Sequence, residues 1–221
     1  MSVQENYDNW EEIFRVRDKE EQQISVTEKV TYYNTNATNY EESMAAGDYS
    51  GPRLTASLLH KYLKGRLDAK ILDVCGGTGL VIRELRKFAS YNNADGLDAA
   101  ENMMAVAKEN GLYNNIFPQY FTLESDVPSN SYDALSSCGA FLPGHLKAEV
   151  VTKMCDIVKP GGYVVIVMRK HFTDYDSNLM QLRPLVHKLA DTKQMELIEE
   201  CVTENYVNGH DGLKIVLRKP C

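Results

Sequence analysis

The residues with the clearest chemical potential form a glycine-rich turn after a short apolar run, Ile-Leu-Asp-Val-Cys-Gly-Gly-Thr-Gly at positions 71–79. Beyond the turn, Val81, Leu85 and Phe88 are spaced like one face of a helix. This pattern predicts a buried strand, a tight loop and the start of a helix. Such a loop can hold part of a small ligand against bare backbone, because glycine places no side chain in the way.

Three classes of ligand suit a loop of this kind, and the neighbouring side chains separate them. A loop that binds nucleotide phosphates ends in Gly-Lys-Ser/Thr, and no such tripeptide follows Gly79. A dinucleotide-binding loop needs a small residue at the position that Ile82 occupies. Asp73, at the end of the predicted strand, would repel a pyrophosphate on the helix N-terminus but would suit an ammonium group.

A second carboxylate also favours a ligand without phosphate. Asp98 lies 19 residues after Gly79, at the end of a second predicted strand. A carboxylate about 20 residues beyond the glycine loop is placed to accept hydrogen bonds from both ribose hydroxyls. A ligand that combines a ribose diol with an amino-acid ammonium, and lacks phosphate, is S-adenosylmethionine. We therefore predict this cofactor, with S-adenosylhomocysteine as its product, and no metal site.

At these motifs the sequence resembles the class I S-adenosylmethionine-dependent methyltransferases. The segments that carry the resemblance are 73–80, 96–98, 103–104 and 159–163. Within this superfamily the sequence is most similar to the Williams–Beuren syndrome chromosome region methyltransferase-like proteins. The residues that carry this narrower resemblance are Tyr33, Tyr40, Tyr49 and the segments 52–54, 111–113 and 131–134. The resemblance extends from about Glu28 to about Arg169.

The motifs assign cofactor-binding roles along the chain. We expect Asp73 to face the methionine ammonium, directly or through the loop and a water, and Asp98 to bind the ribose diol. Ala99 would follow at the edge of the adenine, and Met103 would pack on the adenine face. The residues expected around the methionine portion are Cys75, Gly76, Gly77 and Gly79 through their backbone, and Cys138 and Gly139 beside the transfer point.

The resemblance further implies that Tyr33 and Tyr40 close over the cofactor from the N-terminal side. Several of these residues also have a purely structural interpretation. Tyr33, Tyr40 and Met103 could be ordinary core residues. Asp98 could be a helix N-cap, and Cys138 could be a small buried core residue.

Departures from the family pattern leave a second function open. Cys75 stands where a glycine or alanine is usual, Asn36 where an aromatic is common, and Tyr120 where many relatives carry an acidic residue. The alternative is a protein that binds the cofactor, is catalytically silent and acts through interactions. A nicotinamide-dependent oxidoreductase is the third hypothesis, and Ile82 and Asp73 argue against it.

The methyl acceptor is predicted to be a small molecule. The segment 138–143 after the fourth strand lacks the Asn/Asp-Pro-Pro-Tyr/Phe tetrapeptide of amine-methylating nucleic-acid enzymes, and the net charge of −7 argues against binding through phosphates. His145 and His171 follow the fourth and fifth predicted strands, so either is a candidate general base. Other catalytic residues are unknown, because transfer from a sulfonium chiefly requires the nucleophile to be held in line.

The chain of 221 residues predicts one methyltransferase domain at 27–221, preceded by a polar segment at 1–26. The odd number of cysteines, five, favours a reducing compartment. The N-terminus shows no apolar signal region, and no uncharged apolar stretch is long enough to cross a membrane. We expect a cytoplasmic protein that does not bind membranes, and the sequence carries no strong signal for nucleic-acid binding. The sequence does not predict the oligomeric state.

Strand and helix signals alternate along the chain and then end in a hairpin. Strands are expected at 71–75, just before residue 98, and at 116–121, 132–138, 163–168, 195–206 and 213–218, with a turn at 208–212 between the last two. Pro118 places the third strand at an edge of the sheet. Helices are expected from Pro52, through Met103 and Ala107, and along 146–157. This order fits an α/β sheet with an antiparallel last strand. The family resemblance implies its form, a doubly wound, mostly parallel, seven-stranded Rossmann-like sheet.

Overall fold

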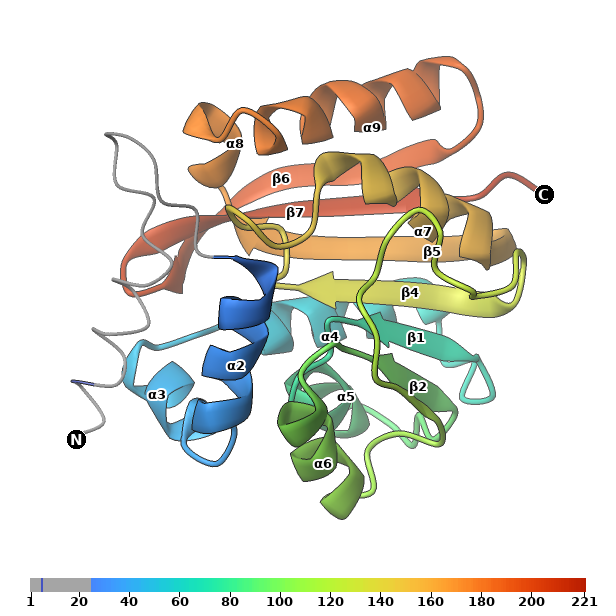
Figure 1. The fold of residues 1–221 in the computed structure, drawn as a ribbon. Coiled ribbons are helices and arrows are strands. Elements are labelled where there is room, and N and C mark those ends of the chain that lie inside the picture. Colours follow the sequence, from blue (N-terminus) through green and yellow to red (C-terminus); the bar gives the residue numbers. More distant parts are fainter. Residues whose placement is uncertain (1–4, 6–24) are drawn as a thin grey trace.

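A computed structural model describes residue 5 and residues 25–221, so the predicted segment 1–26 lies almost wholly outside the described residues. The described chain forms a seven-stranded sheet in the order β3-β2-β1-β4-β5-β7-β6 (Figure 1). The strands are β1 (Ile71–Val74), β2 (Ala94–Leu97), β3 (Ile116–Phe117), β4 (Tyr132–Cys138), β5 (Val158–Arg169), β6 (Glu196–Val207) and β7 (His210–Arg218). Neighbours from β3 to β5 are parallel, whereas β7 is antiparallel to both β5 and β6. The predicted fold class is confirmed.

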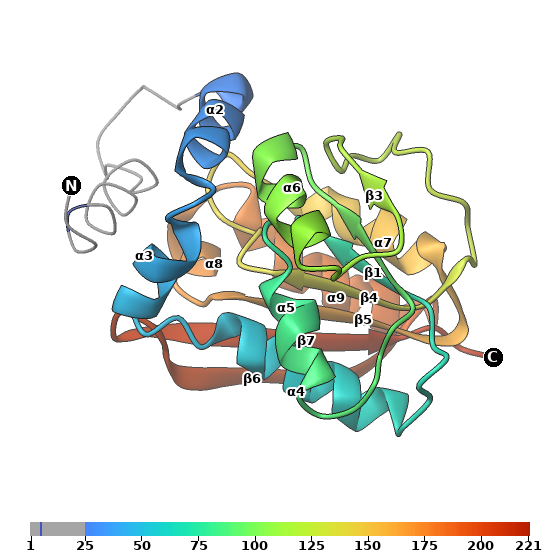
Figure 2. The ribbon, with the colours of Figure 1, turned by 90° about the horizontal axis from the view of Figure 1, so that it is seen from below.

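Helices cover both faces of the sheet. The α-helices are α2 (Val26–Asn36), α3 (Tyr40–Ala46), α4 (Gly51–Leu63), α5 (Leu80–Arg86), α6 (Glu101–Glu109), α7 (Val151–Ile157), α8 (Phe172–Tyr175) and α9 (Leu182–Asp191). The 3₁₀ turns are η1 (Ala148–Val150) and η2 (Leu179–Gln181). In Figures 1 and 2, α4 and α5 lie on one face, α7 and α9 on the other, and α2 and α3 beyond the tip of β4.

The central strand β5 explains why both faces need cover. Its β-branched run alternates between two hydrophobic clusters, with Val164 and Ile166 in the cluster that includes α7 and α9. Val165 and Val167 lie in the cluster that includes α4 and α5. A parallel strand buried on both sides reads as a continuous apolar run rather than as alternation.

Two predicted elements differ from the structure. The third strand is β3 alone, two residues long, and not the predicted 116–121. Pro118 has no N–H to donate to a ladder, so the chain leaves the sheet there and runs on as a loop. The apolar stripe predicted as one helix over 146–157 divides into η1 and α7, and Leu146 precedes both.

The remaining predicted elements are confirmed with small shifts of their ends. β3 is an edge strand, as Pro118 indicated. The hairpin turn is tighter than predicted, because Asn208 (φ 47°) and Gly209 (φ 75°) are its only residues and Val207 pairs with His210. Positive φ at both positions is the pattern of a type I′ turn. Within the described residues, no helix is long and apolar enough to cross a membrane.

Candidate active site

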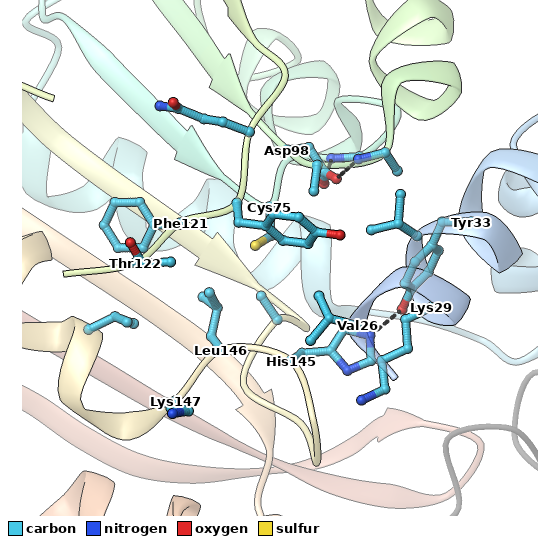
Figure 3. A pocket seen from close by; sticks show the side chains of 18 of the residues that line it. Val26, Lys29, Tyr33, Cys75, Asp98, Phe121, Thr122, His145, Leu146 and Lys147 are labelled. Carbon is cyan, nitrogen blue, oxygen red and sulfur yellow. Dashed lines mark hydrogen bonds between the residues drawn. The ribbon is translucent and has the colours of Figure 1, made fainter. Parts of the chain in front are cut away.

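A cavity of about 460 Å³ lies at the carboxyl ends of β1, β2 and β4 (Figure 3). The helices α2 and α3, the loop 119–124 and the segment 138–150 contribute to its wall. This volume falls in the range of roughly 300–1,000 Å³ that is typical of ligand-binding cavities. Open α/β sheets bind ligands at this edge, where the strand order reverses, and here it reverses between β1 and β4.

The cavity gathers most of the residues that the sequence predicted. Those that line it are Tyr33, Tyr40, Cys75, Gly77, Asp98, Ala99, Met103, Cys138, Gly139 and His145. Those that do not line it are Asp73, Gly76, Gly79 and His171. The predicted site therefore forms around one cavity, with its glycine loop only partly exposed to it.

Asp98 is the carboxylate that the glycine loop holds at the cavity wall, which Glu124 and Glu149 also line. Its Oδ2 accepts a hydrogen bond from the Gly77 N–H at 2.9 Å, and its Oδ1 accepts one from the Ala100 N–H at 2.8 Å. These two bonds join the glycine loop after β1 to the end of β2 and fix the carboxylate between them (Figure 3). Burial raises the pKa of Asp98, while the backbone donors oppose that rise.

The glycine loop supplies backbone to the cavity at Cys75 and Gly77, both in the left-handed region with φ 56° and φ 53°. A Cβ on Gly77 would lie only 3.3 Å from the Cε of Met103, so the loop packs closely against α6 at this point. Cys75 adopts a conformation that costs an L-residue about 1–2 kcal/mol and that glycine adopts freely. Burial raises the pKa of its thiol, so this side chain is neutral.

Asp73 lies behind the loop rather than in the cavity. Its side chain is 1% exposed, and its two oxygens accept hydrogen bonds from Ser136 Oγ at 2.7 Å and Tyr113 Oη at 2.8 Å. Burial raises its pKa to about 6, and the charge of Asp98 adds to the rise. Asp73 can therefore act on a ligand in the cavity only through its field or through the loop.

α2 and α3 hold the predicted tyrosines against the cavity. A capping box between Ser25 and Glu28 starts α2, and an ion pair between Glu41 and Arg83, with a second contact at 2.8 Å, ties α3 to α5. Tyr33 on α2 contacts the ring of Tyr40 on α3 edge-on, with ring centroids 6.2 Å apart. The two tyrosines therefore pack on each other and also line the cavity, so a structural role does not exclude the predicted contact with a ligand.

His145 has a defined tautomer on the cavity wall. Its Nδ1 lies 3.2 Å from the Pro143 carbonyl, which can only accept, so Nδ1 carries the proton. Its Nε2 lies 3.3 Å from Tyr33 Oη and accepts a hydrogen bond from the tyrosine hydroxyl (Figure 3). Burial, with a contribution from the charge of Lys29, lowers the pKa of His145 to about 4, so the imidazole is neutral near pH 7.

His171 was predicted as an alternative base, and the structure does not support that role. Its ring packs on Phe172, Tyr175 and His210, with centroid distances of 4.4, 5.7 and 5.0 Å. α8 begins directly after His171, so the chain turns this ring into an aromatic cluster outside the cavity wall.

Cys138 and Gly139 reach the cavity at the end of β4, as predicted. The Cys138 Sγ lies 3.1 Å from Tyr49 Oη, and burial raises the pKa of the thiol to about 11. Gly139 has φ 67°, and a Cβ there would lie 2.4 Å from the same tyrosine oxygen. Only glycine fits at this point of the wall.

Sequence reasoning missed Lys29 and the apolar part of the loop 119–124. Lys29 lines the cavity with Val26, Val30 and Tyr33, at helical spacings of three, four and seven residues from Val26. This i, i+3, i+4, i+7 stripe is a signal visible in the sequence, and a lysine in its middle is its unusual member. Phe121 was visible only as part of the predicted third strand.

The charges around the glycine loop suit a nucleoside without phosphate. Residues 75–79 contain no lysine or arginine, and the charges that act on Cys75 are the carboxylates of Asp98 and Asp73. The basic residues on the cavity wall, Lys29 and Lys147, come from α2 and from the segment after β4. Within the described residues, no cluster of three or more His, Cys, Asp or Glu side chains could hold a metal ion. The donor set thus fits S-adenosylmethionine better than a pyrophosphate.

Comparisons with known proteins agree with this geometry. Residues 71–162 match a family described as a methyltransferase domain. Methyltransferase-like protein 27 from Homo sapiens is 30% identical over 181 residues, which cover 80% of this chain and 71% of that protein. The chain belongs to the class I S-adenosylmethionine-dependent methyltransferases.

Two solved structures share the fold. The [4+2]-cyclase SpnF has a TM-score of 0.65 at 15% identity, covering 92% of this chain and 99% of that chain. The 1,6-didemethyltoxoflavin-N1-methyltransferase of Burkholderia thailandensis, solved with 1,6-didemethyltoxoflavin and S-adenosylhomocysteine, has a TM-score of 0.58 at 14% identity, covering 91% and 94%. At these identities the comparison shows the fold alone. The narrower resemblance to the Williams–Beuren region proteins stays a prediction.

Proposed function

We propose that this protein binds S-adenosylmethionine in the cavity and transfers its methyl group to a small-molecule acceptor bound beside it. The observation that carries the proposal is Asp98, a buried carboxylate held at the cavity wall by the backbone of the glycine loop. When bound, the cofactor supplies a methyl group on a positively charged sulfur. The remaining task of the protein is to hold the two partners in line and to exclude water.

The cofactor-binding roles predicted from the motifs become specific proposals. Asp98 would accept hydrogen bonds from the ribose hydroxyls, and Ala99 and Met103 would contact the adenine. The backbone of Cys75 and Gly77 would line the methionine portion, with Cys138 and Gly139 near the sulfur. Asp73 would favour the ammonium through its buried charge, while Gly76 and Gly79 shape the loop from behind.

For an acceptor that arrives protonated, His145 and Tyr33 offer a route for the proton. An O–H or N–H group that donates to Tyr33 Oη could pass its proton through the tyrosine hydroxyl to His145 Nε2. Because the pKa of His145 is about 4, the imidazole would take this proton only as bond formation makes the acceptor acidic. We propose no comparable role for His171.

The size and lining of the cavity support a small acceptor. The Burkholderia thailandensis neighbour holds 1,6-didemethyltoxoflavin together with S-adenosylhomocysteine, and we extend that arrangement to this chain as part of the proposal. The net charge of −7 argues against a polyanionic substrate. A cytoplasmic location is also proposed, and cell fractionation would test it.

The test has two stages. Calorimetric titration with S-adenosylhomocysteine, and in parallel with NAD(P), should show binding of the former alone. Transfer of tritium from labelled cofactor into a metabolite extract should then yield a labelled product of low molecular mass. Binding without transfer would favour the catalytically silent interaction protein, and binding of NAD(P) instead would revive the oxidoreductase hypothesis.

A further inference from the structure

Lys29 places a buried positive charge on the cavity wall. The side chain reaches inward from α2 and is 7% exposed, and its Nζ donates to the Gly144 carbonyl at 2.6 Å. In the view of Figure 3, Lys29 and His145 lie on one side of the cavity, Asp98 lies on the opposite side, and Tyr33 lies between them. The lysine therefore lies away from the proposed ribose subsite.

Lys29 forms no ion pair with a carboxylate in the part of the chain that the structure describes, although the charge of Glu28 acts on it from a distance. Its hydrogen bond goes to a neutral carbonyl, and the nearest acid in sequence, Glu28, is engaged by Ser25 at 2.6 and 2.8 Å. Burial lowers the pKa of Lys29, and the charge of Glu28 opposes that shift without cancelling it. Buried lysines are rare unless they are paired.

Lys147, the other lysine on the cavity wall, differs from Lys29 in both burial and partner. Lys147 is exposed, and its Nζ lies 3.9 Å from Glu149. Lys29 has three N–H donors, of which one bonds to Gly144, so two remain for a ligand. Val26 and Val30 flank it on the same stripe of α2 and give this end of the cavity an apolar wall.

We propose that Lys29 binds a carboxylate of the methyl acceptor, so that the substrate is a small organic acid with an apolar body. The inference rests on the proposed function, because it names the substrate class of that same cavity. A carboxylate held by Lys29 would bring the rest of the acceptor, including the O–H or N–H group that is methylated, close to Tyr33 and His145, the side chains proposed to take the proton of that group. Its negative charge would also offset the positive charge that disfavours protonation of His145.

The purely structural alternative is that Lys29 only fastens α2 to the loop at Gly144. The test compares acids with their neutral amides on protein saturated with S-adenosylhomocysteine. Benzoate, phenylacetate and indole-3-acetate, each paired with its primary amide, are titrated by calorimetry. At least one acid should bind about tenfold or more tightly than its amide, the gain expected of a charge-assisted hydrogen bond.

Variants assign this preference to the lysine. Lys29→Met should abolish it, and Lys29→Arg, which keeps the charge, should retain most of it. Lys153→Met is the matched control, since Lys153 is also partly buried and donates to a carbonyl, that of Val127 at 3.1 Å, but lies outside the cavity wall. It should leave the preference unchanged.

The outcomes separate this inference from the proposed function. Equal binding of acids and amides, no binding of any acid, or a preference that survives in Lys29→Met would overturn the role of Lys29 while cofactor binding stands. Failure of S-adenosylhomocysteine to bind the parent protein would overturn the proposed function itself. If Lys29→Met does not fold, the comparison of acid with amide on the parent and on Lys29→Arg still decides.

Discussion

Replacing Asp98 by asparagine removes the charge from the proposed ribose subsite and changes few atoms. The carboxylate accepts from the N–H groups of Gly77 and Ala100 at 2.9 and 2.8 Å. An asparagine amide has one oxygen, so its NH₂ must face one of these two donors. The variant therefore loses a charged acceptor for the ligand and also disturbs the loop that carries it.

The size of the effect follows from these bonds. Hydrogen bonds to a charged group contribute about 1.5–3 kcal/mol, so losing them should weaken binding of S-adenosylhomocysteine roughly 10- to 150-fold. Asp98→Ala should fall in the same range. Isothermal titration calorimetry measures the affinity, and thermal unfolding confirms that each variant is folded.

Asp95→Asn is the control, because Asp95 is a carboxylate three residues earlier, on β2, but lies outside the cavity wall. Its side chain is 1% exposed and accepts from Asn115 Nδ2 and Tyr132 Oη, both at 2.8 Å. This variant should lose stability while it keeps its affinity for S-adenosylhomocysteine. If folded Asp98→Asn binds the ligand as tightly as the parent, Asp98 does not hold the ribose and the reasoning is refuted.

Three further predictions concern the wall of the cavity. The pKa of His145, about 4, lies below its ordinary value, so the unfolded chain binds the extra proton and stability should fall by about 1–3 kcal/mol between pH 6.5 and pH 4. Urea unfolding should show a smaller loss of stability between these two pH values in His145→Gln, and an unchanged loss would contradict the burial argument. Gly139→Ala should destabilise more than Gly209→Ala in thermal melts, because both have positive φ but only the first would place its Cβ 2.4 Å from another atom. Cys221, which is exposed, should react first with iodoacetamide, and Cys75 should resist because burial raises its pKa; faster labelling of Cys75 by mass spectrometry would refute this.

The parts of the site that the sequence revealed are those encoded locally. Cys75, Gly77 and Asp98 come from two consecutive strand ends, and the spacing between such ends is set by one strand–helix–strand unit. Apolar periodicity likewise identified β4 and β5, because strands buried on both faces have little freedom in composition. The fold class followed from the order of these signals together with the resemblance to class I methyltransferases.

The parts that the sequence concealed depend on contacts between distant elements. Asp73 was predicted to face the methionine ammonium directly or through the loop and a water, and the choice between these depends on Tyr113 and Ser136, 40 and 63 residues away, which donate to its two oxygens. Lys29 meets Gly144 across 115 residues, and no local pattern encodes that distance. Such pairings appear only when the whole chain has folded, so a single sequence leaves them open.

The choice between the two candidate histidines shows the same limit at the scale of a single turn. His145 and His171 both follow strands at the carboxyl edge, and nothing in the sequence favours one over the other. After β4, positive φ at Gly139 and Gly144 lets the chain loop back so that His145 meets Tyr33. After β5, α8 begins at once and carries His171 into its own aromatic neighbours.

The electrostatics of the two ends of the cavity fit one kind of chemistry. At one end Asp73 and Asp98 lie near enough that the charge of Asp98 raises the pKa of Asp73, so a cationic ligand is favoured there and a phosphate disfavoured. At the other end Lys29 adds positive charge in a protein of net charge −7. The ammonium and sulfonium groups of the cofactor would lie near the negative charges of Asp73 and Asp98. The carboxylate of an acidic acceptor would lie near the positive charge of Lys29. An uncharged acceptor would offer Lys29 no carboxylate, and for that reason we propose the acid as the substrate class.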